Sequence, residues 1–183
     1  MLFLPLTVWA DSAITSKLAT GELSRGAFTV NARFAIRLNA TLEDALQQGV
    51  PLTFRLDFYL TRPRVYSYWR QLATWFEPTA SQQYKLSYHS LSGQFRVSAG
   101  SLYLNFPRLD DALMVIGATR GWQVLTASQV GSTSVTDFAG NLRLRLDTTQ
   151  LPLPFQLNIL KSSEWALDSG MVPLNVLETD AKP

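Results

Sequence analysis

The sequence predicts a mainly β protein of the α+β type, with an antiparallel β-sandwich-like core and two or three short helices inserted between strands. Apolar and polar residues alternate without a break through residues 52–61, the pattern of a strand buried on one face. The same alternation returns at residues 28–38 and 142–146. Strands buried on one face favour antiparallel pairing. Hydrophobic residues make up 46% of the 183 residues and charged residues 16%, which suits one packed domain.

The other strands are expected from shorter runs of alternation or from apolar runs between turn signals. They are predicted at residues 14–18, 84–88, 95–97, 102–106, 122–125, 155–159, 165–167 and 172–177. Ser92-Gly93 is a turn signal between two of these runs, so residues 84–97 are expected to form a hairpin.

Two short helices are predicted between strands. In the first, residues 41–48, Thr41 can cap the N-terminus and Gly49 can end the helix. The second is expected to open at Pro107, in the first helical position, and to end at Gly117 or Gly121. The two helices share a pattern, Leu-Glu-Asp-Ala-Leu at residues 42–46 and Leu-Asp-Asp-Ala-Leu at residues 109–113. This pattern indicates either an internal duplication or two independent amphipathic helices.

The first ten residues, MLFLPLTVWA, are apolar and uncharged. They match the back half of a secretory signal peptide that lacks its basic start, with Ala10 as the processing site. The alternative is a buried N-terminal strand. The run is shorter than the roughly 20 residues that span a bilayer. We therefore expect a truncated signal peptide at residues 1–10, a single domain at residues 11–177 and a frayed tail at residues 178–183.

Several kinds of chemistry lack the residues they need. The chain has no cysteine and one histidine, so thiolate and transition-metal sites are not expected, nor is any cofactor. A Ser-His-Asp hydrolase would have to use His89, and no nucleophile-elbow pattern accompanies it. The net charge of +2 is too small to indicate nucleic acid. We expect a protein that is not an enzyme, with a hydrolase that uses His89 as the alternative.

Arginines recur on the polar faces of the predicted strands. If these faces share one sheet, they form a basic surface that could contact anionic lipid or an acidic protein. Its predicted members are Arg33, Arg37, Arg55, Arg143 and Arg145. The alternative is a neutral, structural face, on which carboxylates of Glu22, Glu164 or Asp168 pair with the arginines. Arg145-Leu146-Asp147 also echoes Arg55-Leu56-Asp57, so charges could pair between these two strands if they are antiparallel neighbours.

A second candidate surface follows the strand at residues 52–61. Arginine and aromatic residues, which are enriched in interface hot spots, lie together there. Its members are Arg62, Arg64, Tyr66, Tyr68 and Trp69. The alternatives are a membrane surface, an aromatic lid over the core, or a proline-stiffened strand end with no binding role.

Four ordered blocks of the sequence resemble the DUF4390 family of exported proteobacterial proteins. They are GVPLTFRLDFYLTRPR, YKLSYHSLSGQFRVSAGSL, RLDDALMVIGATRGWQV and LRLRLDTTQLPLPFQLNILKSSEWALDSG, and the resemblance covers roughly residues 25–170. After Arg64 the chain departs from the family's Trp-Tyr-Trp pattern. The resemblance implies export, assigns no catalytic residue, and points to a membrane sensor kinase as a neighbour of these proteins.

Three hypotheses of function follow. The first is a non-catalytic periplasmic or envelope domain, soluble or peripheral to the inner membrane, that contacts another envelope protein, such as a sensor kinase. The second is a carrier of an apolar or anionic small molecule such as a lipid, which would need a cavity lined by Phe34, Phe54, Phe58 and Leu144. The third is an enzyme, which would need His89 beside a carboxylate and a serine.

Overall fold

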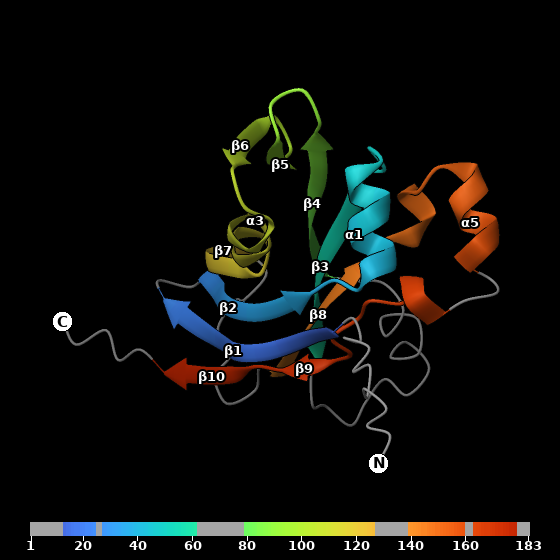
Figure 1. The fold of residues 1–183 in the computed structure, drawn as a ribbon. Coiled ribbons are helices and arrows are strands. Elements are labelled where there is room, and N and C mark those ends of the chain that lie inside the picture. Colours follow the sequence, from blue (N-terminus) through green and yellow to red (C-terminus); the bar gives the residue numbers. More distant parts are fainter. Residues whose placement is uncertain (1–12, 25–26, 62–78, 127–138, 160–162, 179–183) are drawn as a thin grey trace, which may run out of the picture.

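The computed structural model describes residues 13–24, 27–61, 79–126, 139–159 and 163–178, and within these ranges the chain forms two β-sheets (Figure 1). The four-stranded sheet has the order β10-β1-β2-β7, and the six-stranded sheet has the order β6-β5-β4-β3-β8-β9. All pairs are antiparallel except β1 with β10. The mainly β, α+β fold predicted from the sequence is confirmed.

The bounds of the strands follow the chain. They are β1 Ala13–Ser24, β2 Ala27–Arg37, β3 Leu52–Thr61, β4 Ala80–His89, β5 Gln94–Ala99, β6 Leu102–Phe106, β7 Ala118–Leu125, β8 Ala139–Leu146, β9 Val172–Pro173 and β10 Asn175–Glu178. The helical segments are α1 Ala40–Gln47, α3 Leu109–Ile116, η2 Thr148–Gln150, α5 Leu153–Ile159 and η3 Ser163–Trp165.

Both predicted helices carry the chain from one sheet to the other. Helix α1 leads from β2 in the four-stranded sheet to β3 in the six-stranded sheet, and α3 leads from β6 back to β7. The two strand-helix-strand units therefore cross between the sheets in opposite directions, and β2 of the first unit pairs with β7 of the second.

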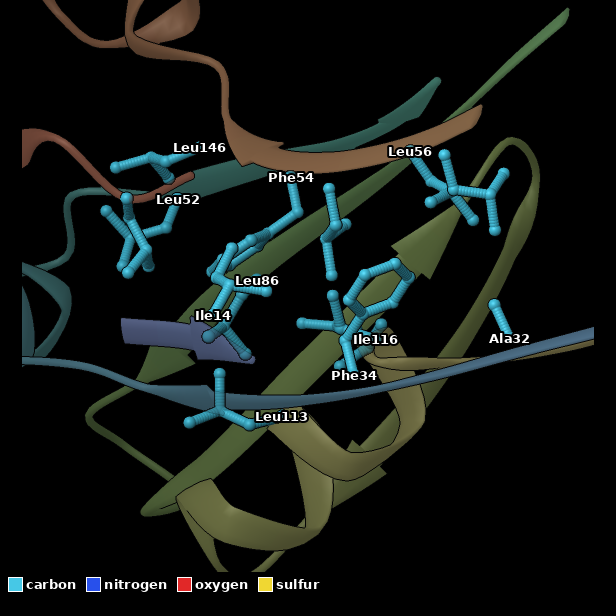
Figure 2. Packing of buried hydrophobic residues seen from close by; sticks show 14 of the residues in the cluster. Ile14, Ala32, Phe34, Leu52, Phe54, Leu56, Leu86, Leu113, Ile116 and Leu146 are labelled. Carbon is cyan, nitrogen blue, oxygen red and sulfur yellow. The ribbon is translucent and has the colours of Figure 1, made fainter. Parts of the chain in front are cut away.

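One hydrophobic core lies between the sheets and under the two helices. The rings of Phe28 on β2 and Phe58 on β3 meet across it with centroids 6.0 Å apart. Figure 2 shows Phe34 from β2, Phe54 from β3 and Ile116 from α3 within the same cluster. Each such side chain stabilises the fold by about 1.5–3 kcal/mol relative to an exposed one. The alternating apolar residues of β2, β3 and β8 thus form the core, as their pattern predicts.

The helix ends differ from the sequence-based expectation. Asn39, not Thr41, caps α1, since its side-chain oxygen accepts a hydrogen bond of 2.9 Å from the N–H of Leu42. Arg108 occupies the N-cap of α3, so Pro107 precedes the helix and is not its first residue. Gly117 ends α3, as predicted. A Cβ there would lie 2.2 Å from the carbonyl oxygen of Phe34, so the approach of α3 to β2 requires glycine.

Two predicted strands are wrong. Residues 155–159 belong to helix α5, because Phe155 and Gln156 donate backbone hydrogen bonds to the carbonyl of Pro152. Pro154 is tolerated there, since the first turn of a helix needs no N–H from it. Trp165 ends the 3-10 turn η3 and packs against the ring of Phe155 at 5.6 Å. Three alternating apolar residues are too few to distinguish a strand from a short buried helix.

Strand β1 is longer than residues 14–18, the range that its sequence predicts. All of it pairs with β2, but the register shifts between Ser16 and Leu18. One extra residue in a strand reverses the faces of all residues that follow, which hides the alternation in the sequence.

The expectations for the chain ends lie outside the described residues, so the signal peptide at residues 1–10 and the tail at residues 178–183 stay predictions. Within the described ranges, none of the helices has the length and apolar character that crossing a membrane requires.

Candidate functional site

A group of charged and polar side chains lies on the face of the six-stranded sheet that points away from the core. Because side chains alternate along β3, the buried Leu56 and Phe58 place Asp57 on this opposite face. The strand register sets Asp57 opposite Ser81 of β4 and Arg143 of β8, and Arg55 opposite Arg145. We call these residues, together with Asp168, the charged cluster; its members are Arg55, Asp57, Ser81, Arg143, Arg145 and Asp168.

Asp57 is the centre of the charged cluster and is fully buried. Its Oδ1 accepts hydrogen bonds from Arg55 Nε at 2.8 Å and from Ser81 Oγ at 2.5 Å. Its Oδ2 lies 3.4 Å from Nη2 of Arg145 and accepts no hydrogen bond, and Arg145 Nε is likewise buried without a hydrogen-bond partner. Removing a partner from a buried ion pair leaves an uncompensated charge, which costs roughly 3–5 kcal/mol. The carboxylate is therefore committed to holding β3, β4 and β8 together.

Arg143 and Asp168 form the second ion pair of the charged cluster. Arg143 Nε donates to both carboxylate oxygens at 3.0 Å, and Nη2 donates to Oδ2 as well. Burial pulls the pKa of Asp168 upward, but the hydrogen bonds from Arg143 and the Gly170 N–H outweigh it, so this pKa lies below its ordinary value. The hydrogen bond to Asp168 raises the pKa of Arg143, against the lowering effect of burial. Both groups are thus stabilised in their charged forms.

The charges of the cluster nearly balance. Three arginines face two carboxylates, and all three lie close to at least one carboxylate. Asp168 reaches the cluster through an isolated bridge with Arg145. Pairing of charges between β3 and β8 was predicted, and it is confirmed, although its acid partners are Asp57 and Asp168. Asp147 instead accepts hydrogen bonds from the N–H and hydroxyl of Thr149 at the start of η2.

The predicted basic face of five arginines is wrong for two of them. Arg33 and Arg37 lie exposed on β2, in the other sheet, so they do not share a surface with Arg55, Arg143 and Arg145. The sequence pattern places each arginine on a polar strand face but does not say which strands share a sheet.

Two of the proposed acid partners lie elsewhere. Glu22 accepts a hydrogen bond from Asn31 within the four-stranded sheet, and Glu164 accepts one from Thr41. The second candidate surface lies outside the described residues. Its members are Arg62, Arg64, Tyr66, Tyr68 and Trp69.

His89 ends β4 at the turn to β5, where its carbonyl accepts hydrogen bonds from the N–H groups of Ser92 and Gly93. Within the ranges that the structure describes, no group of three or more acidic or histidine side chains could hold a metal ion. The residues around His89 that the contacts identify are thus turn-forming groups.

A polar pocket of about 260 Å³ lies beside the charged cluster, on the same face of the sheet. Lys85 supplies its positive charge. The lining residues are Pro51, Thr53, Gln83, Lys85, Ser98, Gly100 and Gln150. Sequence reasoning missed this pocket, because it forms only where β3, β4, the β5–β6 turn and η2 meet. The polar face of the predicted strand at residues 84–88 was the one signal that could have pointed to Lys85.

The fold and the charged cluster define a class: a β-rich domain of two sheets whose outward-facing charges pair with one another. The chain belongs to the DUF4390 family, described as a domain of unknown function, whose family model matches residues 10–175. The resemblance inferred from the sequence is thereby confirmed. No curated protein and no solved structure matches the chain.

Proposed function

We propose that this protein is a non-catalytic exported domain of the bacterial envelope that acts through protein contacts, as an accessory to a membrane signalling system. The periplasm, or the periplasmic surface of the inner membrane, is the proposed location. The apolar start of the chain and its resemblance to exported proteins support export.

The observation that carries the proposal is that the interior is filled and the outward charges are internally paired. Phe34, Phe54, Phe58 and Leu144, which would line the cavity of a carrier, are at most 4% exposed and belong to one packed cluster. The ion pairs of Asp57 and Asp168 leave these carboxylates bound to arginine. Contacts at the outer surface are then the mode of action that suits the domain best.

Crosslinking in the native envelope tests this proposal. Arg62→Ala with Arg64→Ala is expected to reduce the recovery of a crosslinked membrane protein, because arginine beside aromatic residues favours protein contact. The matched control is Arg33→Ala with Arg37→Ala, two exposed arginines of β2. Equal recovery from both double variants, or recovery of no envelope protein by the wild type, would contradict the proposal. Fractionation of the cells tests the location in the same experiment.

A second candidate function is binding of an anionic small molecule, such as a phosphorylated headgroup, in the polar pocket. Lys85 and the neighbouring hydroxyl and amide groups support it. Native mass spectrometry of the chain purified from the envelope would then detect a bound small molecule. Lys85→Gln should lose that molecule, whereas Lys17→Gln on exposed β1 should retain it.

A further inference from the structure

Strand β6 ends the six-stranded sheet, and its sequence is unusual for the edge of a sheet (Figure 1). Among the described residues, no strand pairs with it on the side away from β5. An unpaired edge offers free N–H and C=O groups to another chain, and proteins usually block it with a charge, a proline, a bulge or a very short strand. β6 reads Leu-Tyr-Leu-Asn-Phe and pairs with β5 in an unbroken register, so it has none of these devices.

The other edges that can be compared are blocked. β9 is two residues long and contains Pro173. β7 carries exposed Arg120 and Gly121, and its register with β2 shifts twice. β6 is thus distinguished from both by its regular and uncharged edge.

The core of the protein also runs off the sheet at β6. One row of apolar residues crosses four paired strands, from Leu52 through Leu86 and Val97 to Leu104. Its first three members are at most 4% exposed, whereas Leu104 is 58% exposed and the neighbouring Leu102 is 76% exposed. Helix α3, which contacts β5 and β6, adds exposed Met114. The end of the core therefore forms an apolar surface beside the free backbone edge.

The backbone of β6 fixes which groups are free. Gly100-Ser101 is a two-residue turn, so the flanking pair, Ala99 and Leu102, exchanges both of its hydrogen bonds. The same holds at every second pair, including Val97 with Leu104. Tyr103 and Asn105 consequently direct their N–H and C=O groups away from β5.

The edge is complementary to itself. In an antiparallel pair of two β6 strands related by a two-fold axis at Leu104, Tyr103 lies opposite Asn105 of the other copy. Four backbone hydrogen bonds can form, and Leu104 meets Leu104 while Leu102 meets Phe106 on the apolar face. No charge opposes a like charge in this pairing, because β6 carries none. The opposite face is already ordered within one chain, since Arg96 donates to Asn105 and lies over the ring of Tyr103.

We propose that β6 is a self-association surface, through which two copies of this chain join their six-stranded sheets by antiparallel β6–β6 pairing. A second copy is the occupant that fits best, since it offers the same apolar face, the same free groups and the same absence of charge. The inference goes beyond the proposed function, because the pairing of two copies needs no envelope partner.

Sedimentation equilibrium of the purified full chain tests this inference. The wild type should approach twice the mass of one chain as its concentration rises. Leu104→Arg places two like charges opposite each other at the two-fold axis, so its dissociation constant should rise by at least about tenfold. The matched control is Leu91→Arg, which adds the same charge at a fully exposed residue in the turn after β4.

Thermal melts of both variants are expected to match the wild type, because neither side chain is buried. A wild type that stays monomeric at all concentrations would overturn the inference, as would a Leu104→Arg dimer as stable as the Leu91→Arg dimer. Loss of crosslinked envelope proteins without a change in dimer mass would count against the proposed function alone.

Discussion

The centre and the edge of the six-stranded sheet use their residues in opposite ways. At the centre, the carboxylate of Asp57 is fully buried on the outward face, between strands β4 and β8. At the edge, Leu102 and Leu104 are more than half exposed. The charged residues thus serve the internal structure of the sheet, while apolar residues are left on its surface.

This contrast changes where a binding surface should be sought. The arginines of β3 and β8 look like a basic surface in the sequence, but each lies close to Asp57 or Asp168. Paired charges offer little to a partner, since the existing ion pair must first be broken. The uncharged β6 edge offers unpaired backbone groups and exposed leucine side chains at no such cost.

The largest effect is expected at Asp57. Asp57→Ala should reduce the free energy of unfolding by about 4 kcal/mol, because it leaves Arg55 and Arg145 without their shared buried partner. Urea unfolding measures the loss, with Ser81→Ala as the control that removes one hydrogen bond, about 1 kcal/mol. A loss below about 1 kcal/mol for Asp57→Ala would mean that the ion pairs do not hold the sheet together.

A pair of leucine truncations compares the core with the edge directly. Leu86→Ala should cost about 3 kcal/mol, since it opens a cavity in the packed row. Leu104→Ala, two strands away in the same row, should cost no more than about 0.5 kcal/mol in the monomer. Chemical unfolding at protein concentrations low enough to keep the chain monomeric gives both values. Similar losses at the two positions would show that Leu104 is buried within a single chain.

A smaller effect is expected at Asp168. Asp168→Asn should reduce the free energy of unfolding by about 1 kcal/mol near neutral pH, a value kept low because both partners are about one-third exposed. Since folding lowers the pKa of Asp168, its stabilisation is present above the unfolded pKa of about 3.9 and is lost as pH falls through the folded value. The stabilities of wild type and variant should therefore converge below about pH 4. A constant difference down to low pH would contradict the ion pair.

The sequence predicted the elements better than it predicted their arrangement. Alternation identified β2, β3 and β8, because these strands have one buried face and an even register. It could not separate Arg33 from Arg55, since the crossing of α1 to the second sheet is set by tertiary packing. The pairing of Arg143 with Asp168 was open for a related reason, because 25 residues separate them.

Local pattern also failed where geometry departs from the regular period. The register shift in β1 hid a long strand, and the short apolar run at residues 155–159 fits a helix as well as a strand. The exposed edge of β6 was predicted as a strand, but its place at the end of the sheet follows only from the pairing of all six strands.

The most direct test of the account is amide hydrogen exchange at β6, measured by NMR over a range of protein concentrations. The account predicts that exchange at Tyr103 and Asn105 slows as the concentration rises, because their N–H groups become bonded across the pair of copies. The Leu104 amide, which already faces Val97 of β5, should be protected throughout. Fast exchange at Tyr103 and Asn105 at every concentration, with Leu104 protected, would contradict the self-association surface.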